Sequence, residues 1–371
     1  MDFDFSDDQQ QLREAVSRWV DKGYDFDRRR AIVQAGGFDR AAYGEMAELG
    51  LCGLYVSEDN GGMGMGPVEA MVTLEALGRG IVLEPLTQTL IASALLQTHA
   101  PAALQSAWLG RIAGGEALVV LAHQERGARY RLEACAATAQ AQGEGFVIDG
   151  AKSLVPVGDM ADAWIVPAQL DGALALFLVE RGAAGASTQA YPMQDGARAA
   201  ELRLSASPAQ LITRQGAAAL AQAQDIGIAC LCAEAVGVME RTVAITADYL
   251  NTRKQFGVTI ASFQALRHRL ADMKMQLELA RSMSYYASLK LHAPEDERRQ
   301  AMSRAKVQLG QSMRYVGQQA VQLHGGIGVT DEYIVSHYFK KLTQMEMSWG
   351  DTLHHLGEVS ARMQDTAGVF A

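Results

Sequence analysis

The 371-residue sequence predicts an α+β protein that is mostly helical, with helices at both ends and a β-rich middle. From Phe5 to about Leu109 the apolar residues recur every three or four positions, the pattern of amphipathic helices. Between Glu116 and about Thr213 short β-rich pieces such as "GFVIDGAK" alternate with Gly and Asp. After about Gln215 the helical spacing returns in longer runs.

Residues 1–115 are expected to form an N-terminal helical domain. Its helical runs include "QQQLREAVSRWV", "AAYGEMAELGLCGLY" and "EAMVTLEALGRGIV", and the glycine-rich stretch 60–66 interrupts them. Residues 116–213 are expected to form a small antiparallel β domain, because the strand-like pieces are short and closely spaced.

Residues 214–371 are expected to form a C-terminal four-helix bundle. One helix ends near Asn251, two more carry apolar stripes, and a last one begins near Thr352. Spacings of three and four place each stripe on one helix face, which is what facing helices require. The stripes are Phe263, Leu266, Leu270, Met273 and Leu277, then Leu309, Met313, Val316, Ala320 and Leu323.

Composition excludes several classes of function. A net charge of −9 and a pI near 5.4 argue against nucleic-acid binding, which needs clustered Lys and Arg. No uncharged apolar run approaches the roughly 18 residues of a membrane span, and the acidic start lacks the features of a signal peptide, so a cytoplasmic protein is expected. The four cysteines do not stand at metal-ligand spacings, so buried free thiols and no metal site are expected.

Three segments, in this order, resemble the acyl-CoA dehydrogenase family: "GLCGLYVSEDNGGMGM", "NTRKQFGVTIASFQALRHRLADM" and "AVQLHGGIGVTDEYIVSHYFK". The resemblance covers nearly the whole chain. It implies a helical, β and four-helix-bundle architecture, with FAD held between the β domain and the bundles of two subunits. It also implies an acyl-CoA substrate that loses an α-proton and a β-hydride, with electrons leaving to an electron-transferring flavoprotein.

The resemblance also implies which residues bind the cofactor. Arg253 matches an arginine that reaches the FAD pyrophosphate of a neighbouring subunit, where a guanidinium suits phosphate oxygens. Glycines in "LHGGIG" match positions where backbone approaches the adenosine end of FAD. The cofactor-binding residues expected on this ground are Arg253, Gln255, Phe256, Gln264, Gln322, Gly325 and Gly326.

The stretch "QMEMSWGDTLHHL" departs from the family pattern. The usual catalytic glutamate falls on Trp349, whose indole cannot abstract a proton, and the alternative position on an earlier helix falls on Gly227. The nearest candidate bases are Asp351, Glu346 and Glu234. Asp351 is the first choice, although it is expected to cap the last helix, and Glu346 is expected to be solvated.

The β-rich region departs from the pattern as well. A run that supports and stacks on the flavin ring in the family falls on "SLVP", which puts Leu154 and Pro156 at those places, and proline has neither a hydroxyl nor an amide hydrogen. A flavin-binding loop falls on "QERGARYR" (124–131), where only Glu125, Gly127 and Ala128 match.

The pattern of matches favours one interpretation. Parts that a subunit lends to its neighbour's FAD are kept, while parts that hold its own flavin ring are changed. The chain thus resembles the subunits of heteromeric acyl-CoA dehydrogenases that supply no base, with a paralogous subunit as partner. Two alternatives stay open: a self-sufficient homo-oligomer with a relocated base, and a flavin-free scaffold in which Arg126, Arg129 and Arg131 contact CoA phosphates.

Overall fold

The computed structural model describes residues 5–143 and 145–366, and its contacts group the chain into two compact units. The helical unit takes the chain up to Arg29, Pro67–Val82 and everything from Ile228 onward. The mixed unit takes Arg30–Gly66 and Leu83–Gly227. The mostly helical α+β class expected from the sequence is confirmed, while the three-domain division at 115/116 and 213/214 stays a prediction.

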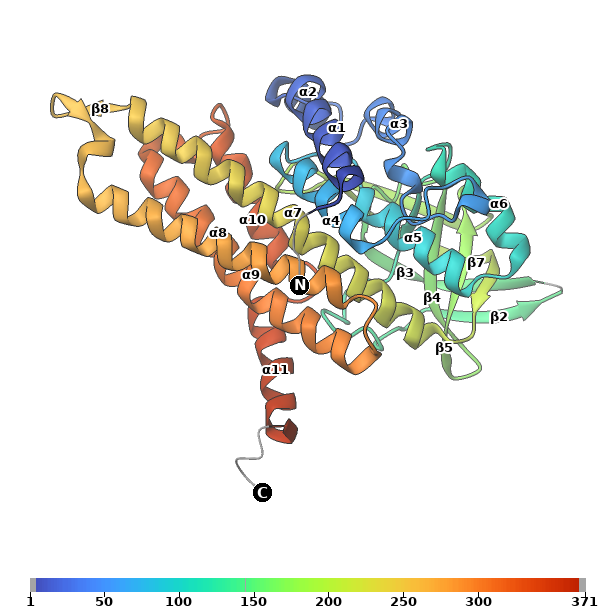
Figure 1. Ribbon diagram of the computed structural model, residues 1–371. Helices are drawn as coiled ribbons and strands as arrows, with labels where there is room; N and C mark the ends of the chain where they lie inside the picture. The colour runs from blue at the N-terminus through green and yellow to red at the C-terminus, as the bar shows by residue number, and fades with distance from the viewer. Residues whose placement is uncertain (1–4, 144, 367–371) are drawn as a thin grey trace. The chain divides into compact units, whose positions relative to one another are not determined.

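The helical unit is built around long helices (Figure 1). They are α7 (Gly216–Thr252), whose first residues up to Gly227 fall in the mixed unit, α8 (Gln264–Lys290), α9 (Glu295–His324), α10 (Ile334–Met347) and α11 (Thr352–Thr366). Of these, α8, α10 and α11 pack on α9. The second predicted stripe is wholly buried in their core. In the first stripe Met273 and Leu277 are buried, but Phe263 is 38% exposed because it stands at the start of α8.

Two shorter helices complete this unit, α1 (Asp7–Gly23) and α4 (Pro67–Arg79). Ser6 and Gln9 cap the start of α1 reciprocally. Helix α4 crosses α7 backbone to backbone, because a Cβ added at Gly78 would strike the Glu234 carbonyl and one added at Gly237 would strike that of Glu75. Gly237 is therefore a packing residue.

The mixed unit is built on a seven-stranded sheet. Its order is β1-β4-β2-β3-β7-β5, β4 also pairs with β5, and β6 pairs with β7, so five strands form a closed ring. Most pairs are antiparallel as expected, but β1 and β2 run parallel to β4. The strands are β1 (Val119–Leu121), β2 (Thr138–Gln142), β3 (Gly145–Pro156), β4 (Ala163–Leu170), β5 (Ala173–Glu180), β6 (Ala186–Pro192) and β7 (Arg198–Thr213).

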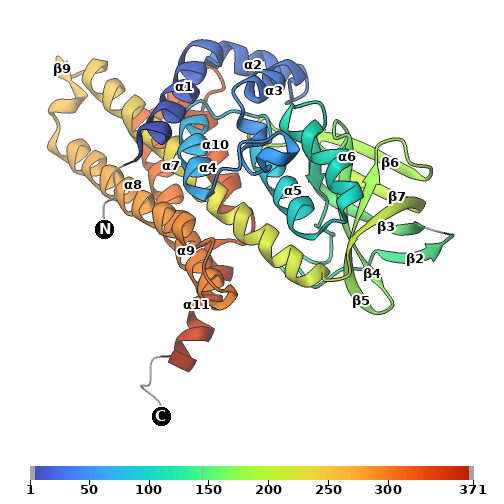
Figure 2. The same cartoon turned by 45° about the vertical axis from the view of Figure 1, so that its right-hand side comes forward.

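Several helices of the mixed unit lie beside this sheet in Figure 2. Gln88 on α5 (Leu86–His99) accepts a hydrogen bond from the backbone of Leu121 on β1, at 3.1 Å. The others are α3 (Arg40–Glu48), α6 (Ala102–Ala113) and the short turns η1 (Leu51–Gly53) and η2 (Glu58–Asn60), while α2 (Phe26–Gln34) begins in the helical unit.

The structure bears on three expectations drawn from the sequence, which concern membrane-spanning helices, metal-binding clusters and cysteines. None of its helices is long and apolar enough to cross a membrane. Within residues 5–143 and 145–366 no group of three or more His, Cys, Asp or Glu side chains is arranged to hold a metal ion. The cysteines are free thiols; Cys52, Cys230 and Cys232 are buried, and Cys135 is half-buried.

Candidate functional site

The junction between α10 and α11, residues 345–355, contains the position where the family pattern places a base. Trp349 has left-handed backbone (φ 58°) and packs, half-buried, against the core of the helical unit. Gly350 follows with φ 103°, and a Cβ there would lie 2.6 Å from Nε2 of His355. His355 Nε2 lies 2.8 Å from the Trp349 carbonyl, so this nitrogen carries the hydrogen and donates. The backbone at position 349 is thus fixed by its contacts with His355, but the side chain there is an indole.

Glu346 is buried and not solvated, so the expectation that it faces water is wrong. Its carboxylate accepts from the Thr352 amide at 3.0 Å, from the Thr352 hydroxyl at 2.6 Å and from Arg314 at 3.2 Å. Glu346 therefore closes the start of α11 and joins it to α10. Its three donors engage this carboxylate inside the junction, which favours a structural role.

Lys306 fixes the same junction from α9. Its buried amine donates to the carbonyls of Met345 at 3.1 Å and Glu346 at 2.7 Å, in the last turn of α10. Burial lowers the pKa of Lys306 to about 8, although Cys232, Glu346 and Asp351 act in the opposite sense. Sequence patterns gave no sign of this lysine, because it lies on α9 and acts on the end of α10.

The remaining candidate bases also have partners. Asp351 accepts from the His354 amide at 2.8 Å, which is a cap on the first turn of α11. Glu234 forms an ion pair with Lys341 at 2.7 Å. Gly227 lies inside α7 and offers no side chain. The assignment of Asp351 as a relocated base stays a prediction, and its capping bond favours a structural role.

The residues expected to bind FAD gather at one end of the helical bundle, called here the bundle end. This end comprises the turn from α7 to α8, with strands β8 (Lys254–Gln255) and β9 (Val258–Thr259) and the turn η3 (Ile260–Ser262), and the turn η4 (Gly325–Val329) after α9. The Tyr249 hydroxyl donates to the His324 carbonyl at 3.3 Å, and their rings stack at 4.4 Å, which ties the two turns together. All seven residues are exposed: Arg253, Gln255, Phe256, Gln264, Gln322, Gly325 and Gly326.

The bundle end suits a nucleotide in two respects. A Cβ at Gly325 or Gly326 would meet no atom within 4 Å, so both backbones are open to close approach from outside. The exposed Arg253 makes no side-chain hydrogen bond or ion pair to other described residues. These residues fit an anionic ligand. His324, beside them, is buried, and its Nδ1 donates to the Ala320 carbonyl at 2.8 Å.

The matched loop in the mixed unit is anchored by a buried ion pair that motif reading alone did not reveal. Glu125 accepts from Lys152 at 2.6 Å and from the amides of Ala136 at 2.7 Å and Ala137 at 3.2 Å. Burial raises the pKa of Glu125, but the bonds from Lys152 and the two amides outweigh it and hold the pKa below its usual range. Glu125 and Lys152 are thus the framework of the loop.

The flavin-ring positions in the mixed unit do not fit a flavin. Pro156 has no amide hydrogen. Leu154 keeps its amide, but the amide donates to the Tyr191 hydroxyl at 3.0 Å. The arginine-rich loop faces acidic residues of the same unit, with Arg126 3.4 Å from Glu201.

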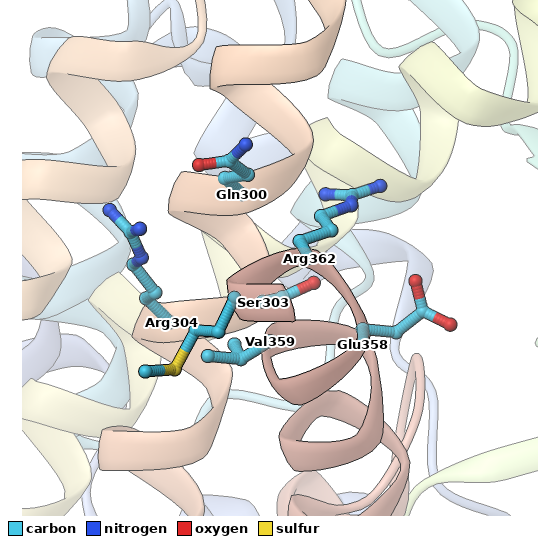
Figure 3. A pocket seen from close by; sticks show the side chains of 7 residues that line it. Gln300, Ser303, Arg304, Glu358, Val359 and Arg362 are labelled. Atoms are coloured by element: carbon cyan, nitrogen blue, oxygen red, sulfur yellow. The ribbon is translucent and has the colours of Figure 1, made fainter. Parts of the chain in front are cut away.

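Neither of two hollows in the described chain coincides with these residues. The first is a water-sized cavity of about 10 Å³ between α9 and α11, lined by Gln300, Ser303 and Arg304 facing Glu358, Val359 and Arg362 (Figure 3). The second is an open groove of about 450 Å³ over β3, β5 and β7 of the mixed unit.

Two regions of the chain match the domains of a known protein family. Residues 6–116 match the N-terminal domain of acyl-CoA dehydrogenases, and residues 214–364 match the C-terminal domain. Acyl-CoA dehydrogenase FadE27 of Mycobacterium tuberculosis is 27% identical over 340 residues, covering 89% of each chain.

Two solved structures are similar to this chain over nearly its whole length. The ChsE4-ChsE5 complex from Mycobacterium tuberculosis superimposes with a TM-score of 0.91 at 26% identity, covering 99% of this chain and 100% of that one. A variant of the Tcur3481-Tcur3483 steroid ACAD superimposes with a TM-score of 0.89 at 29% identity, covering 97% and 98%. The chain belongs to the acyl-CoA dehydrogenase family.

Proposed function

We propose that this chain is the subunit of a heteromeric acyl-CoA dehydrogenase that completes the FAD site of a paralogous partner and supplies no base itself. The reaction is the α,β-desaturation of an acyl-CoA thioester, with electrons passing to an electron-transferring flavoprotein. The observation that carries the proposal is the contrast between the two sites. The bundle end is exposed and its Arg253 side chain makes no bond to other described residues, whereas the base position holds Trp349.

In this proposal the residues of the bundle end act on the partner's cofactor. Arg253 binds the pyrophosphate through its guanidinium, which suits phosphate oxygens in both charge and geometry. Gly325 and Gly326 admit the adenosine end to the backbone, since a Cβ there would stand in open space. FAD supplies the hydride acceptor for the reaction. The chemistry that falls to this chain is binding and orientation.

The junction of α10 and α11 supports the absence of a base on this chain. Trp349 cannot take a proton, and the carboxylates of Glu346 and Glu234 are each engaged by a cationic side chain. The α-proton of the substrate is then removed by a carboxylate of the partner. The similar ChsE4-ChsE5 complex and Tcur3481-Tcur3483 steroid ACAD are each named for two proteins, which supports a two-subunit assembly.

The test is the visible absorption spectrum of the chain purified alone, together with its mass in solution. The proposal predicts a colourless chain that becomes part of a yellow complex when it is co-expressed with an acyl-CoA dehydrogenase paralogue. About one FAD per chain in a homo-oligomer would refute it and would favour a self-sufficient enzyme.

A further inference from the structure

Strand β3 carries a bulge beside the buried Lys152. Lys152 pairs with Leu202 of β7, but the next registered pair is Val155 with Ala200. Three steps along β3 therefore match two along β7, which leaves one extra residue on β3. Leu154 takes left-handed backbone at φ 53°, and its side chain is 44% exposed. A bulge of this kind leaves a backbone amide outside the ladder, at the surface of the mixed unit.

Tyr191, on the edge strand β6, takes this amide. The Leu154 N–H donates to the Tyr191 hydroxyl at 3.0 Å. Tyr191 and Pro156 both pair with Ala199, on opposite sides of β7, so the phenol reaches across β7 to the bulge. Burial raises the pKa of Tyr191, so the group that accepts this bond is a neutral phenol.

The polar groups beside Leu154 also have partners within the mixed unit. The Ser153 amide donates to the Gln124 carbonyl at 2.8 Å, and the Ser153 hydroxyl donates to Glu201 at 3.2 Å. Glu201 also holds Arg126, at 3.4 Å. The Ser153 amide and hydroxyl and the Glu201 carboxylate on this face thus have their partners within one unit of the chain.

We propose that this face of the mixed unit is closed to a flavin ring by the chain's own side chains, with Tyr191 as the residue that occupies the Leu154 amide. The inference rests on the proposed function and extends it, because it names the device that leaves this chain without a flavin of its own. A ring placed against residues 154–156 would have to displace the Tyr191 hydroxyl. Pro156 would offer no amide in return.

The first test is hydrogen exchange of the Leu154 amide in the full chain. Tyr191→Phe keeps the ring and removes the hydroxyl, and Tyr286→Phe on α8 of the helical unit is the control. Loss of the hydrogen bond is expected to speed exchange of the Leu154 amide by about five- to tenfold, while Tyr286→Phe leaves it unchanged. Equal exchange in the wild type and Tyr191→Phe would overturn the inference.

The second test is a titration of the same three proteins with FMN up to millimolar concentration, followed by flavin fluorescence. Removing the competing hydroxyl is expected to tighten FMN binding by about five- to tenfold in Tyr191→Phe alone. If the lone chain is flavin-free but Tyr191→Phe binds FMN no better than the wild type, this inference falls and the proposed function stands. If the wild-type chain alone carries about one FAD, both fall.

Discussion

Trp349 shows how much of this chain's structure is committed to a position that carries no base. A non-glycine residue in left-handed backbone costs roughly 1–2 kcal/mol, so its neighbours must hold it. His355 donates to its carbonyl, Glu346 closes the next helix, and Lys306 takes the last carbonyls of α10. The backbone geometry of the junction is therefore fixed by side chains from three helices, independently of which side chain stands at 349.

The first prediction at this scale is a pH dependence that comes from His355. Burial lowers its pKa to about 3, so the folded chain keeps a neutral imidazole while the unfolded chain gains a proton below about pH 6.5. The unfolded state then binds more protons, and stability falls as pH drops from about 6.5 toward 3, by at most about 1.4 kcal/mol per pH unit. Chemical denaturation across this range is expected to show a shallower pH dependence in His355→Gln than in the wild type.

The exposed His292 provides the control, because His292→Gln is expected to leave the pH profile unchanged. An identical profile for His355→Gln and the wild type would show that His355 is not the group that titrates on unfolding.

The second residue-scale prediction concerns Gly350. Gly350→Ala places a Cβ against His354 and His355, and the residue has φ 103°, which alanine rarely adopts. A loss of at least about 2 kcal/mol in the free energy of unfolding is expected from the clash and the strain together. Gly357→Ala is the matched control, because Gly357 lies within α11 with no atom near its Cβ and should gain up to about 1 kcal/mol.

At the scale of elements, features within one element could be predicted from local sequence pattern, whereas contacts between residues far apart in the sequence could not. The helical stripes and the turns of the bundle end could be recognised from spacing and motif alone. The Leu154–Tyr191 bond joins residues 37 apart, and the His355–Ser303 contact joins residues 52 apart. Such pairs depend on how strands and helices meet, and no spacing within one element reports them. Glu346 shows the same limit, since only the fold reveals the arginine beside it.

The crossing of α4 and α7 gives an element-scale prediction. Gly237→Ala directs a methyl group at the Glu75 carbonyl, so the two helices must separate. The free energy of unfolding is expected to fall by about 1–3 kcal/mol, the usual cost of overpacking. Gly44→Ala, inside α3 with open space at its Cβ, is the control and should stabilise the chain slightly. Equal effects of the two substitutions would contradict a tight crossing.

The bundle end gives a further prediction. Arg253→Ala is expected to release FAD from the complex with a paralogue while leaving the unfolding of the lone chain unchanged, because the side chain is exposed and makes no bond to other described residues. Flavin content after gel filtration measures the first effect and chemical denaturation the second. Arg304→Ala, an exposed arginine on α9 outside the bundle end, should change neither. Normal FAD occupancy in Arg253→Ala would remove this arginine from the cofactor site.

For the whole molecule, the family and its architecture followed from three motifs, whereas the proposed division of labour between subunits rests on groups that are exposed or already engaged. Gly325 ends α9 with left-handed backbone, so its place in the turn is explained within this chain, while the exposed Arg253 side chain makes no bond to other described residues, which favours a role toward another chain. The acyl group of the substrate is not specified by any motif, since pocket shape depends on packing.

The last prediction separates the heteromeric enzyme from a self-sufficient one. Asp351→Asn keeps a good helix cap toward the His354 amide, since Asn and Asp cap equally well. It removes the ability to take a proton, together with the negative charge that acts on Lys306. A general base contributes about 10²–10⁴-fold to rate, so loss of turnover on that scale in the complex would identify Asp351 as the base. We expect an unchanged turnover number, and the same result for Glu234→Gln, because in the proposed assembly the proton is taken by a carboxylate of the partner. Unchanged turnover in both variants would leave the partner's chain as the place to look for the base.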